Sequence, residues 1–106
     1  MLLNVFFVEI ERKGNSSIIV GCIYRPPNTD VSLFNAEMSS ILYKIRDSKL
    51  IFIAGDFNLD LIKVGSHEPT DEFLNTVATH SFSPIIRDPT RITETTATLI
   101  DNIYIF

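Results

Sequence analysis

The stretch Leu50-Ile51-Phe52-Ile53-Ala54-Gly55-Asp56-Phe57-Asn58 is an apolar run that leads directly into a carboxylate and a carboxamide. A short apolar run bounded by a turn signal is typical of a buried strand. Strands of α/β sheets carry such continuous runs when other elements cover both of their faces. The pattern therefore predicts a central strand over residues 50–57, covered on both faces.

Two polar side chains stand where this strand ends. Side chains alternate between faces along a strand, so Asp56 and Asn58 are predicted to share one face while Phe57 points to the other. A carboxylate beside a carboxamide is suited to gripping a cation or a phosphate group. The sequence Gly-Asp-Phe-Asn is also typical of a simple turn, because Gly, Asp and Asn favour turn conformations. Both interpretations stand on these residues alone.

The hydrophobic pattern predicts two helices. The first begins near Thr29 or Asp30, either of which can cap it. Its apolar face consists of Phe34, Met38, Ile41, Leu42 and Ile45. The second helix is shorter, is capped by Thr70, and has an apolar face made of Phe73, Leu74, Val77 and Ala78.

Further strands are predicted towards both ends of the chain. Residues 2–10 and 17–25 are β-prone and flank a turn, which predicts an antiparallel hairpin. The last strands are predicted at 84–87 and 98–106, linked by a loop rich in Pro and Thr. Strands and helices in this order indicate an α/β fold with a mixed sheet, in one domain over residues 1–106.

Composition limits the class of protein. The chain has 106 residues, 45% of them hydrophobic, which is enough for one core. Its net charge of −4 has the wrong sign for holding DNA by phosphate neutralisation alone. The single cysteine, Cys22, lies in an apolar strand and is predicted to be a buried core thiol. With no basic leader and no run long enough to span a bilayer, we expect an intracellular protein, nuclear or cytoplasmic, that is not secreted and has no membrane partner.

Three blocks of sequence carry a family resemblance. They are Ile18-Ile19-Val20-Gly21-Cys22-Ile23-Tyr24-Arg25-Pro26-Pro27-Asn28, then the stretch of residues 50–58 quoted above, then Asp88-Pro89-Thr90-Arg91-Ile92-Thr93 with Thr98-Leu99-Ile100-Asp101-Asn102-Ile103-Tyr104-Ile105-Phe106. In this order they resemble the endonuclease/exonuclease/phosphatase superfamily, and most closely the endonuclease domain of non-LTR retrotransposons. The resemblance implies a partial DNase I-like α/β sandwich, truncated at both ends, that corresponds to the C-terminal half of the family's domain.

The resemblance also implies roles for four residues. Asp56 would act on the attacking water, and Asn58 and Tyr24 would contact the phosphate that is cut. Asp101 would support the histidine of a Ser-Asp-His motif that lies beyond this chain. Independently of the resemblance, alternation puts Asp101 on the face of Leu99, Ile103 and Ile105, so we expect a buried carboxylate that needs a partner.

Two arginines are candidates for substrate binding. Arg25 follows Tyr24 and would add a positive charge for the nucleic-acid backbone, unless it is simply a solvated surface residue. Arg91 lies in the Pro-Thr loop and would touch a DNA phosphate, unless it is a loop residue without a partner. His67 and His80 are expected at the surface, because neither has the sequence context of the family's histidine.

The function that the resemblance implies is Mg2+-dependent nicking of DNA, so that the freed 3′ hydroxyl can prime reverse transcription. No metal ligand in the chain is certain, because the family's ligating Glu would lie upstream of residue 1. DNA is the expected substrate, a reverse transcriptase domain is expected in the parent polypeptide, and the chain alone is expected to be inactive. The alternatives are a phosphatase or sphingomyelinase-like member of the superfamily, and a catalytically dead α/β module.

Overall fold

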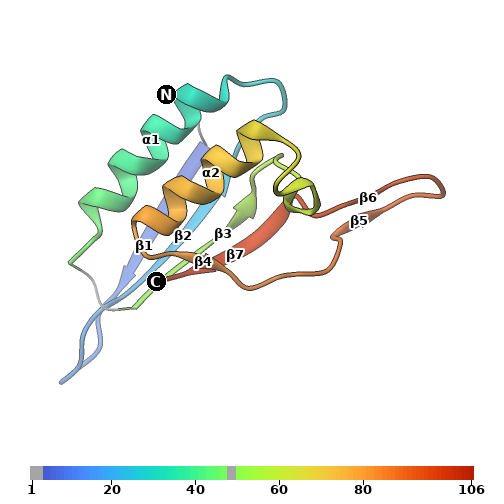
Figure 1. The fold of residues 1–106 in the computed structure, drawn as a ribbon. Helices are drawn as coiled ribbons and strands as arrows, with labels where there is room; N and C mark the ends of the chain where they lie inside the picture. The colour runs from blue at the N-terminus through green and yellow to red at the C-terminus, as the bar shows by residue number, and fades with distance from the viewer. Residues whose placement is uncertain (1–3, 48–49) are drawn as a thin grey trace.

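The computed structural model describes residues 4–47 and 50–106. A five-stranded mixed sheet carries two helices on one face (Figure 1). From edge to edge the strands are β1 (Asn4–Ile10), β2 (Ile18–Tyr24), β3 (Leu50–Asp56), β7 (Asp101–Ile105) and β4 (Ser83–Pro84). β2 and β3 are parallel, and the other neighbours are antiparallel. The α/β class and the mixed sheet predicted from the sequence are confirmed; residues 2–3 of the first predicted strand lie outside the described ranges.

Helix α1 (Val31–Lys44) starts where the sequence predicts. Asp30 is its N-cap, and its carboxylate accepts hydrogen bonds from the backbone nitrogens of Ser32 and Leu33. The residues of the predicted apolar face that are fully buried are Phe34, Met38 and Leu42. No helix in the described ranges is long and apolar enough to cross a membrane.

Helix α2 (Glu68–Thr79) differs from the prediction in its N-cap and in one residue of its apolar face. Its N-cap is His67, and Thr70 lies inside the helix, where it is buried and bonds His67 Nδ1 through its hydroxyl at 2.8 Å. Ala78 is exposed, so the apolar face consists of Phe73, Val77 and the partly buried Leu74. Pro69 at the start of the helix explains the shift, because proline is favoured in a first turn.

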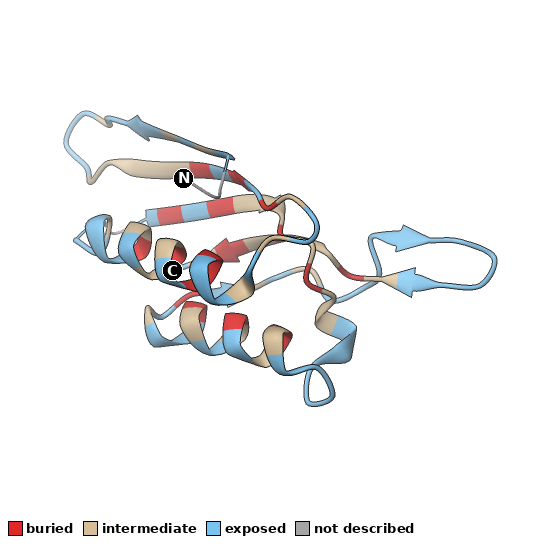
Figure 2. Ribbon diagram, turned by 90° about the horizontal axis from the view of Figure 1, so that it is seen from above, coloured by how far each residue is buried: buried red, intermediate tan, exposed pale blue. Residues whose placement is uncertain are grey.

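The core lies between the helices and one face of the sheet. In Figure 2 the residues coloured as buried lie on both helices and on the strands of the sheet. Phe73 of α2 is its centre, with ring centroids 5.4 Å from Phe34, 5.4 Å from Phe57 and 5.6 Å from Tyr104. Burial raises the pKa of the Tyr104 phenol above its ordinary value. The helix layer and the sheet layer thus meet at one aromatic cluster.

The opposite face of the sheet is open in the described part of the chain. Phe6 is 66% exposed and Phe52 is 39% exposed. The prediction that the central strand is covered on both faces is therefore wrong for these residues. Cys22 shares this face and is exposed, so the predicted buried thiol is wrong for the same reason.

The predicted Pro-Thr loop contains a short hairpin. Its strands are β5 (Arg91–Ile92) and β6 (Ala97–Thr98), which pair only with each other and project from the body of the protein (Figure 1). The hydroxyls of Thr93 and Thr96 bond across its turn at 2.6 Å. A 3-10 turn, η1 (Leu61–Lys63), follows β3.

The aromatic cluster predicts a large difference between two phenylalanines. Phe73→Ala should lower the free energy of unfolding by about 3–5 kcal/mol, because it removes buried area and leaves a cavity. Phe6→Ala, on the open face, is the matched control and should change it by less than about 0.5 kcal/mol. Urea unfolding followed by circular dichroism measures both. Equal losses would show that the core lies elsewhere.

Candidate active site

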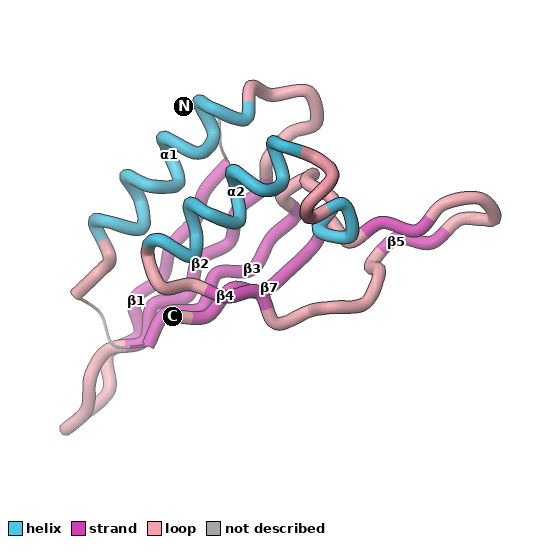
Figure 3. The backbone as a smooth tube through the Cα atoms, in the orientation of Figure 1, coloured by secondary structure: helices cyan, strands magenta, loops and turns pink. Residues whose placement is uncertain are grey.

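Three predicted site residues occupy neighbouring positions across the sheet. Tyr24 is the register partner of Asp56 in the β2–β3 ladder, and Asp56 is the partner of Asp101 in the β3–β7 ladder. Register partners project to the same face. The strands run side by side in Figure 3. The three positions lie at one end of them, because Tyr24 and Asp56 are the last residues of β2 and β3 and Asp101 is the first residue of β7. We call Tyr24, Asp56 and Asp101 the polar row.

The polar row ends an otherwise apolar face. The next position along each strand on this face is Cys22, Ala54 or Ile103, and the one after that is Val20, Phe52 or Ile105. Charged and hydroxyl groups therefore gather at one end of the open face. The convergence of Tyr24, Asp56 and Asp101 comes from register alone, whereas their chemical roles do not follow from it.

Asp56 is held in place by its neighbours. Gly55 lies so close to the carbonyl oxygen of Ile23 that a Cβ at this position would overlap it. The backbone nitrogen of Arg25 donates to the carbonyl oxygen of Asp56 at 2.9 Å. Because Gly55 has no side chain, β3 can approach β2 closely at this point. This close approach fixes the position of Asp56 beside Tyr24.

Asn58 departs from the predicted alternation. Its φ of 49° is left-handed, so the strand ends at Asp56 and the chain turns. The backbone nitrogen of Asn58 donates to Asp56 Oδ1 at 3.1 Å, which is the hydrogen bond of an Asx turn. The turn interpretation is therefore correct, and the turn fixes one oxygen of Asp56 while leaving Oδ2 for other partners.

Arg25 corrects the sequence analysis most strongly. It is buried, with 4% exposure, so the alternative of a solvated surface arginine is wrong. Its contact with a nucleic-acid phosphate stays a prediction. Its guanidinium donates to the carbonyl oxygens of Thr29 at 2.7 Å and Asn58 at 3.1 Å, and stacks 5.5 Å from the Phe34 ring centroid. Desolvation lowers the pKa of Arg25 below its ordinary value. Arg25 is a clamp between the β2 end and the Asn58 turn.

Asn58 closes the clamp from the other side. Its side-chain nitrogen donates to the carbonyl oxygen of Arg25 at 2.6 Å. A carboxamide has two N–H donors, so one remains beyond this bond. The reciprocal Arg25–Asn58 contacts hold the segment after Asp56 against the segment after Tyr24. The sequence signal for this clamp is an Arg directly after a strand, but it does not distinguish an interior from a surface role.

Arg91 pairs with both carboxylates of the polar row. Its Nη2 lies 2.8 Å from Asp56 Oδ2, and its Nε lies 3.9 Å from Asp101 Oδ2. The interpretation of Arg91 as a loop residue without a partner is therefore wrong. The side chains of Arg91, Asp56 and Asp101 are 58%, 18% and 38% exposed.

Asp101 is not the buried carboxylate that the alternation predicted. It does share a face with Ile103 and Ile105, but that face is open. Leu99 is buried before β7 begins and does not belong to the alternating series. Alternation identifies which residues share a face, and it does not show whether anything covers that face.

Asp60 is a positioning residue that the sequence analysis missed. Its Oδ1 accepts from the backbone nitrogens of Ile62 at 3.1 Å and Leu99 at 2.9 Å. It therefore ties the segment after β3 to the segment before β7. An Asp before a 3-10 turn is a recognisable cap, but the bond to Leu99 depends on tertiary structure.

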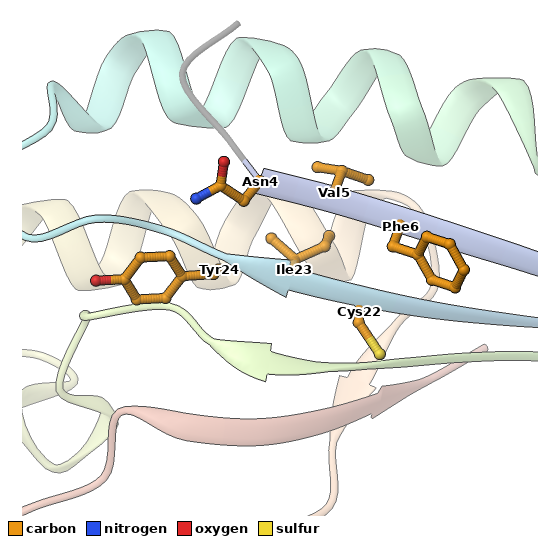
Figure 4. Close-up of a pocket in the computed structure, with 6 residues that line it drawn as sticks. All are labelled: Asn4, Val5, Phe6, Cys22, Ile23 and Tyr24. Carbon is orange, nitrogen blue, oxygen red and sulfur yellow. The ribbon is translucent and has the colours of Figure 1, made fainter.

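A hollow of about 310 Å³ lies beside the polar row, between β1 and β2 (Figure 4). It is lined by Asn4, Val5, Phe6, Cys22, Ile23 and Tyr24. Figure 4 shows Val5 pointing towards α1 and Cys22 pointing away from it. The hollow includes the phenol but neither carboxylate, so it is a neighbour of the polar row and not its centre.

The hydrogen bonds of the two histidines are to residues of the helices and not to the polar row. His67 is exposed and bonds Thr70, as given above. His80 is half-buried and its Nε2 bonds Ser39 Oγ at 2.9 Å, between the two helices. Both bond helix residues.

The chemistry of the polar row suits a small divalent cation held partly by protein. Mg2+ takes oxygen ligands and is often bound by one or two carboxylates together with water and phosphate. Asp56 and Asp101 provide two carboxylates on adjacent strands. Within residues 4–47 and 50–106, no group of three or more His, Cys, Asp or Glu side chains gathers for a metal.

Comparison with known proteins agrees with this fold. A family described as endonuclease-reverse transcriptase matches residues 18–104. The endonuclease domain of TRAS1, a telomere-specific non-LTR retrotransposon, superposes with a TM-score of 0.76 at 15% identity, over 95% of this chain and 49% of that one. An endonuclease/exonuclease/phosphatase family protein from Leptotrichia buccalis gives 0.55 at 13% identity, over 95% and 41%. No curated protein sequence matches this chain.

The structural likeness shows a DNase I-like α/β fold, as the sequence predicted. An endonuclease/exonuclease/phosphatase family protein from Bacteroides thetaiotaomicron superposes with a TM-score of 0.53 at 15% identity, over 95% of this chain and 40% of that one. The chain thus spans half or less of the length of these solved structures.

The clamp predicts that Arg25 stabilises the fold through its hydrogen bonds. Arg25→Met should lower the free energy of unfolding by about 3 kcal/mol, because each buried carbonyl left unpaired costs about 1–3 kcal/mol. Arg25→Lys should restore little, since an ammonium lacks the planar fork. Arg87→Met, at an exposed arginine, is the control and should change stability by less than about 0.5 kcal/mol. Equal stability of the Arg25→Met variant and the wild-type chain in urea would refute the clamp.

Proposed function

The chain belongs to the endonuclease-reverse transcriptase family, and from this premise we propose that it forms part of a Mg2+-dependent phosphodiesterase that nicks DNA. The observation that carries the proposal is the register that places Tyr24, Asp56 and Asp101 side by side. Phosphodiester hydrolysis needs an oriented water, donors to the phosphate and neutralisation of its charge. The polar row supplies groups for the first two.

Asp56 is proposed to orient the attacking water and take its proton. Its Oδ1 is fixed by the Asn58 backbone, so Oδ2 is the oxygen that meets the water. A carboxylate acting as a general base contributes about 10²–10⁴-fold to a rate. The Asx turn thus fixes the direction from which Asp56 acts.

Asn58 and Tyr24 are proposed to donate to the phosphate oxygens. The side-chain N–H of Asn58 that does not bond Arg25 is available for a phosphate oxygen. Tyr24 is 41% exposed, so its phenol is accessible to a ligand on the open face. Neutral donors stabilise an anionic phosphate without competing for the carboxylates.

Asp101 and the cation complete the proposal. Asp101 is proposed to support a histidine supplied by the longer protein, as the family resemblance implies. Mg2+ would be held at the carboxylate oxygens of the row and would polarise the phosphate when bound. Because the chain spans about half of the TRAS1 domain, DNA nicking and an accompanying reverse transcriptase domain are proposals for the whole protein.

The test uses a hybrid in which residues 18–104 replace the matching segment of the TRAS1 endonuclease domain. Incubated with supercoiled plasmid in Mg2+, the hybrid should produce the nicked form. Asp56→Asn retains an oxygen for the Asx turn but removes the charge, so nicking should fall by about 10²-fold or more.

Asp88→Asn is the matched control, because this exposed carboxylate has no hydrogen bond or ion pair with the described residues. It should nick at the rate of the parent hybrid. Circular dichroism of every hybrid shows whether it is folded. A folded Asp56→Asn hybrid that nicks as fast as its parent would disprove the role of Asp56.

A further inference from the structure

Arg91 occupies the oxygen on which the proposed chemistry depends. Asp56 Oδ1 is taken by the backbone nitrogen of Asn58 at 3.1 Å, and Oδ2 is paired with Arg91 Nη2 at 2.8 Å. Each oxygen of Asp56 therefore already has one partner, and Arg91 competes with any water or cation for Oδ2. Activity at this carboxylate is therefore favoured when Arg91 leaves Oδ2.

The position of Arg91 allows its side chain to move away from Asp56 Oδ2. It is the first residue of β5, at the base of the projecting hairpin, and its side chain is 58% exposed. The base itself is anchored, since Thr90 donates through its backbone to the Thr98 carbonyl oxygen at 2.8 Å, and its hydroxyl accepts from Asp101 N at 3.3 Å. The guanidinium can thus change partner by side-chain rotation while the backbone at its base stays fixed.

Energetics favour an exchange of partners with phosphate. The guanidinium of this ion pair is 58% exposed, so water and salt screen it and weaken the pair. A phosphate oxygen is a strong acceptor for a guanidinium and can be bound by two parallel hydrogen bonds. A DNA phosphate on the open face therefore competes with Asp56 for the same donor.

We propose that Arg91 is an exchangeable counter-ion of the polar row. Without DNA, it pairs with Asp56 at 2.8 Å and lies 3.9 Å from Asp101. When a DNA phosphate binds, the guanidinium moves to the phosphate and releases the two carboxylates. Binding of the DNA phosphate to Arg91 thereby frees Asp56, the proposed base, in the same step. This inference rests on the proposed function, because it takes the phosphate of DNA as the competing group.

A comparison with Arg25 explains why we assign the exchange to Arg91. Both arginines lie beside the Asp56 segment, but Arg25 is 4% exposed and bonds backbone carbonyls of the interior. Removing it from those carbonyls would leave buried acceptors unpaired. Among the described residues, the side chain of Arg91 pairs with the two carboxylates, and both keep contact with solvent.

The experiment measures two affinities of the 106-residue chain without requiring turnover. Mn2+ titration, followed by paramagnetic broadening of the amide signals of residues 56 and 101, probes free carboxylate oxygens. Binding of a short DNA duplex at several salt concentrations probes the phosphate contact. The variants are Arg91→Gln, which removes the charge, Arg91→Lys, which keeps the charge without the fork, and Arg87→Gln as the control.

Arg91→Gln should bind Mn2+ more tightly by up to about fivefold, the range expected for losing an exposed competing pair. It should bind the duplex more weakly, with the slope of log affinity against log salt reduced by about one. Arg91→Lys should lie between Arg91→Gln and wild type for Mn2+. Arg87→Gln should leave the broadening at residues 56 and 101 unchanged.

Exchange of Arg91 between the carboxylates and DNA predicts that Arg91→Gln raises the affinity for Mn2+ and lowers the affinity for the duplex. Weaker or unchanged Mn2+ binding by Arg91→Gln overturns the proposal, and so does unchanged duplex affinity. Failure of the wild-type chain to bind the duplex at low salt overturns it as well. These outcomes are independent of the nicking test on Asp56, so failure of the exchange and failure of the proposed function are distinguishable.

Discussion

β3 has β2 on one side and β7 on the other, and the register of these two ladders determines the geometry of the whole polar row. Gly55 permits the close approach to Ile23 that places Asp56 opposite Tyr24. The same strand places Asp56 opposite Asp101 in the antiparallel ladder. Because side chains alternate, a slip of one residue in β7 would turn Asp101 towards the helices and bring Asn102 to the open face. The aromatic cluster resists such a slip, since Tyr104 packs against Phe57 and Phe73 only in this register.

Two arginines then surround Asp56 in contrasting environments. Arg25 is buried, bonds backbone carbonyls and contributes to stability by holding the turn that begins at Asn58. Arg91 is exposed and bonds carboxylates, and because water screens its guanidinium it contributes less to stability than the buried Arg25 does. A rigid turn fixes the direction of Asp56, and a weakly held counter-ion leaves its second oxygen open to exchange. Rigidity and exchange at the same carboxylate therefore come from burial of one guanidinium and exposure of the other.

The sequence was informative where a local pattern coincides with the tertiary environment. The apolar run before Asp56, the stripe of α1 and the cap at Asp30 are local signals, and the structure has all three. Burial was mispredicted at Phe52, Cys22 and Asp101, because alternation assigns a face but not what covers it. The environment of Arg25 could not be read, since its partners include Asn58, 33 positions away. The β5–β6 hairpin was not predicted, because strands of two residues are too short to show the alternation of apolar and polar residues. The catalytic roles of Tyr24, Asp56, Asn58 and Asp101 remain predictions.

The polar row and the proposals built on it depend on the register of β7 against β3, and cross-strand NMR contacts measure this register. In an antiparallel ladder, facing residues give characteristic short proton distances between the two backbones. The structure predicts such contacts between Asp56 and Asp101 and between Ala54 and Ile103. Contacts that pair Asp56 with Asn102 would place Asp101 on the helix side, away from Arg91, and would contradict the polar row and the proposals that depend on it.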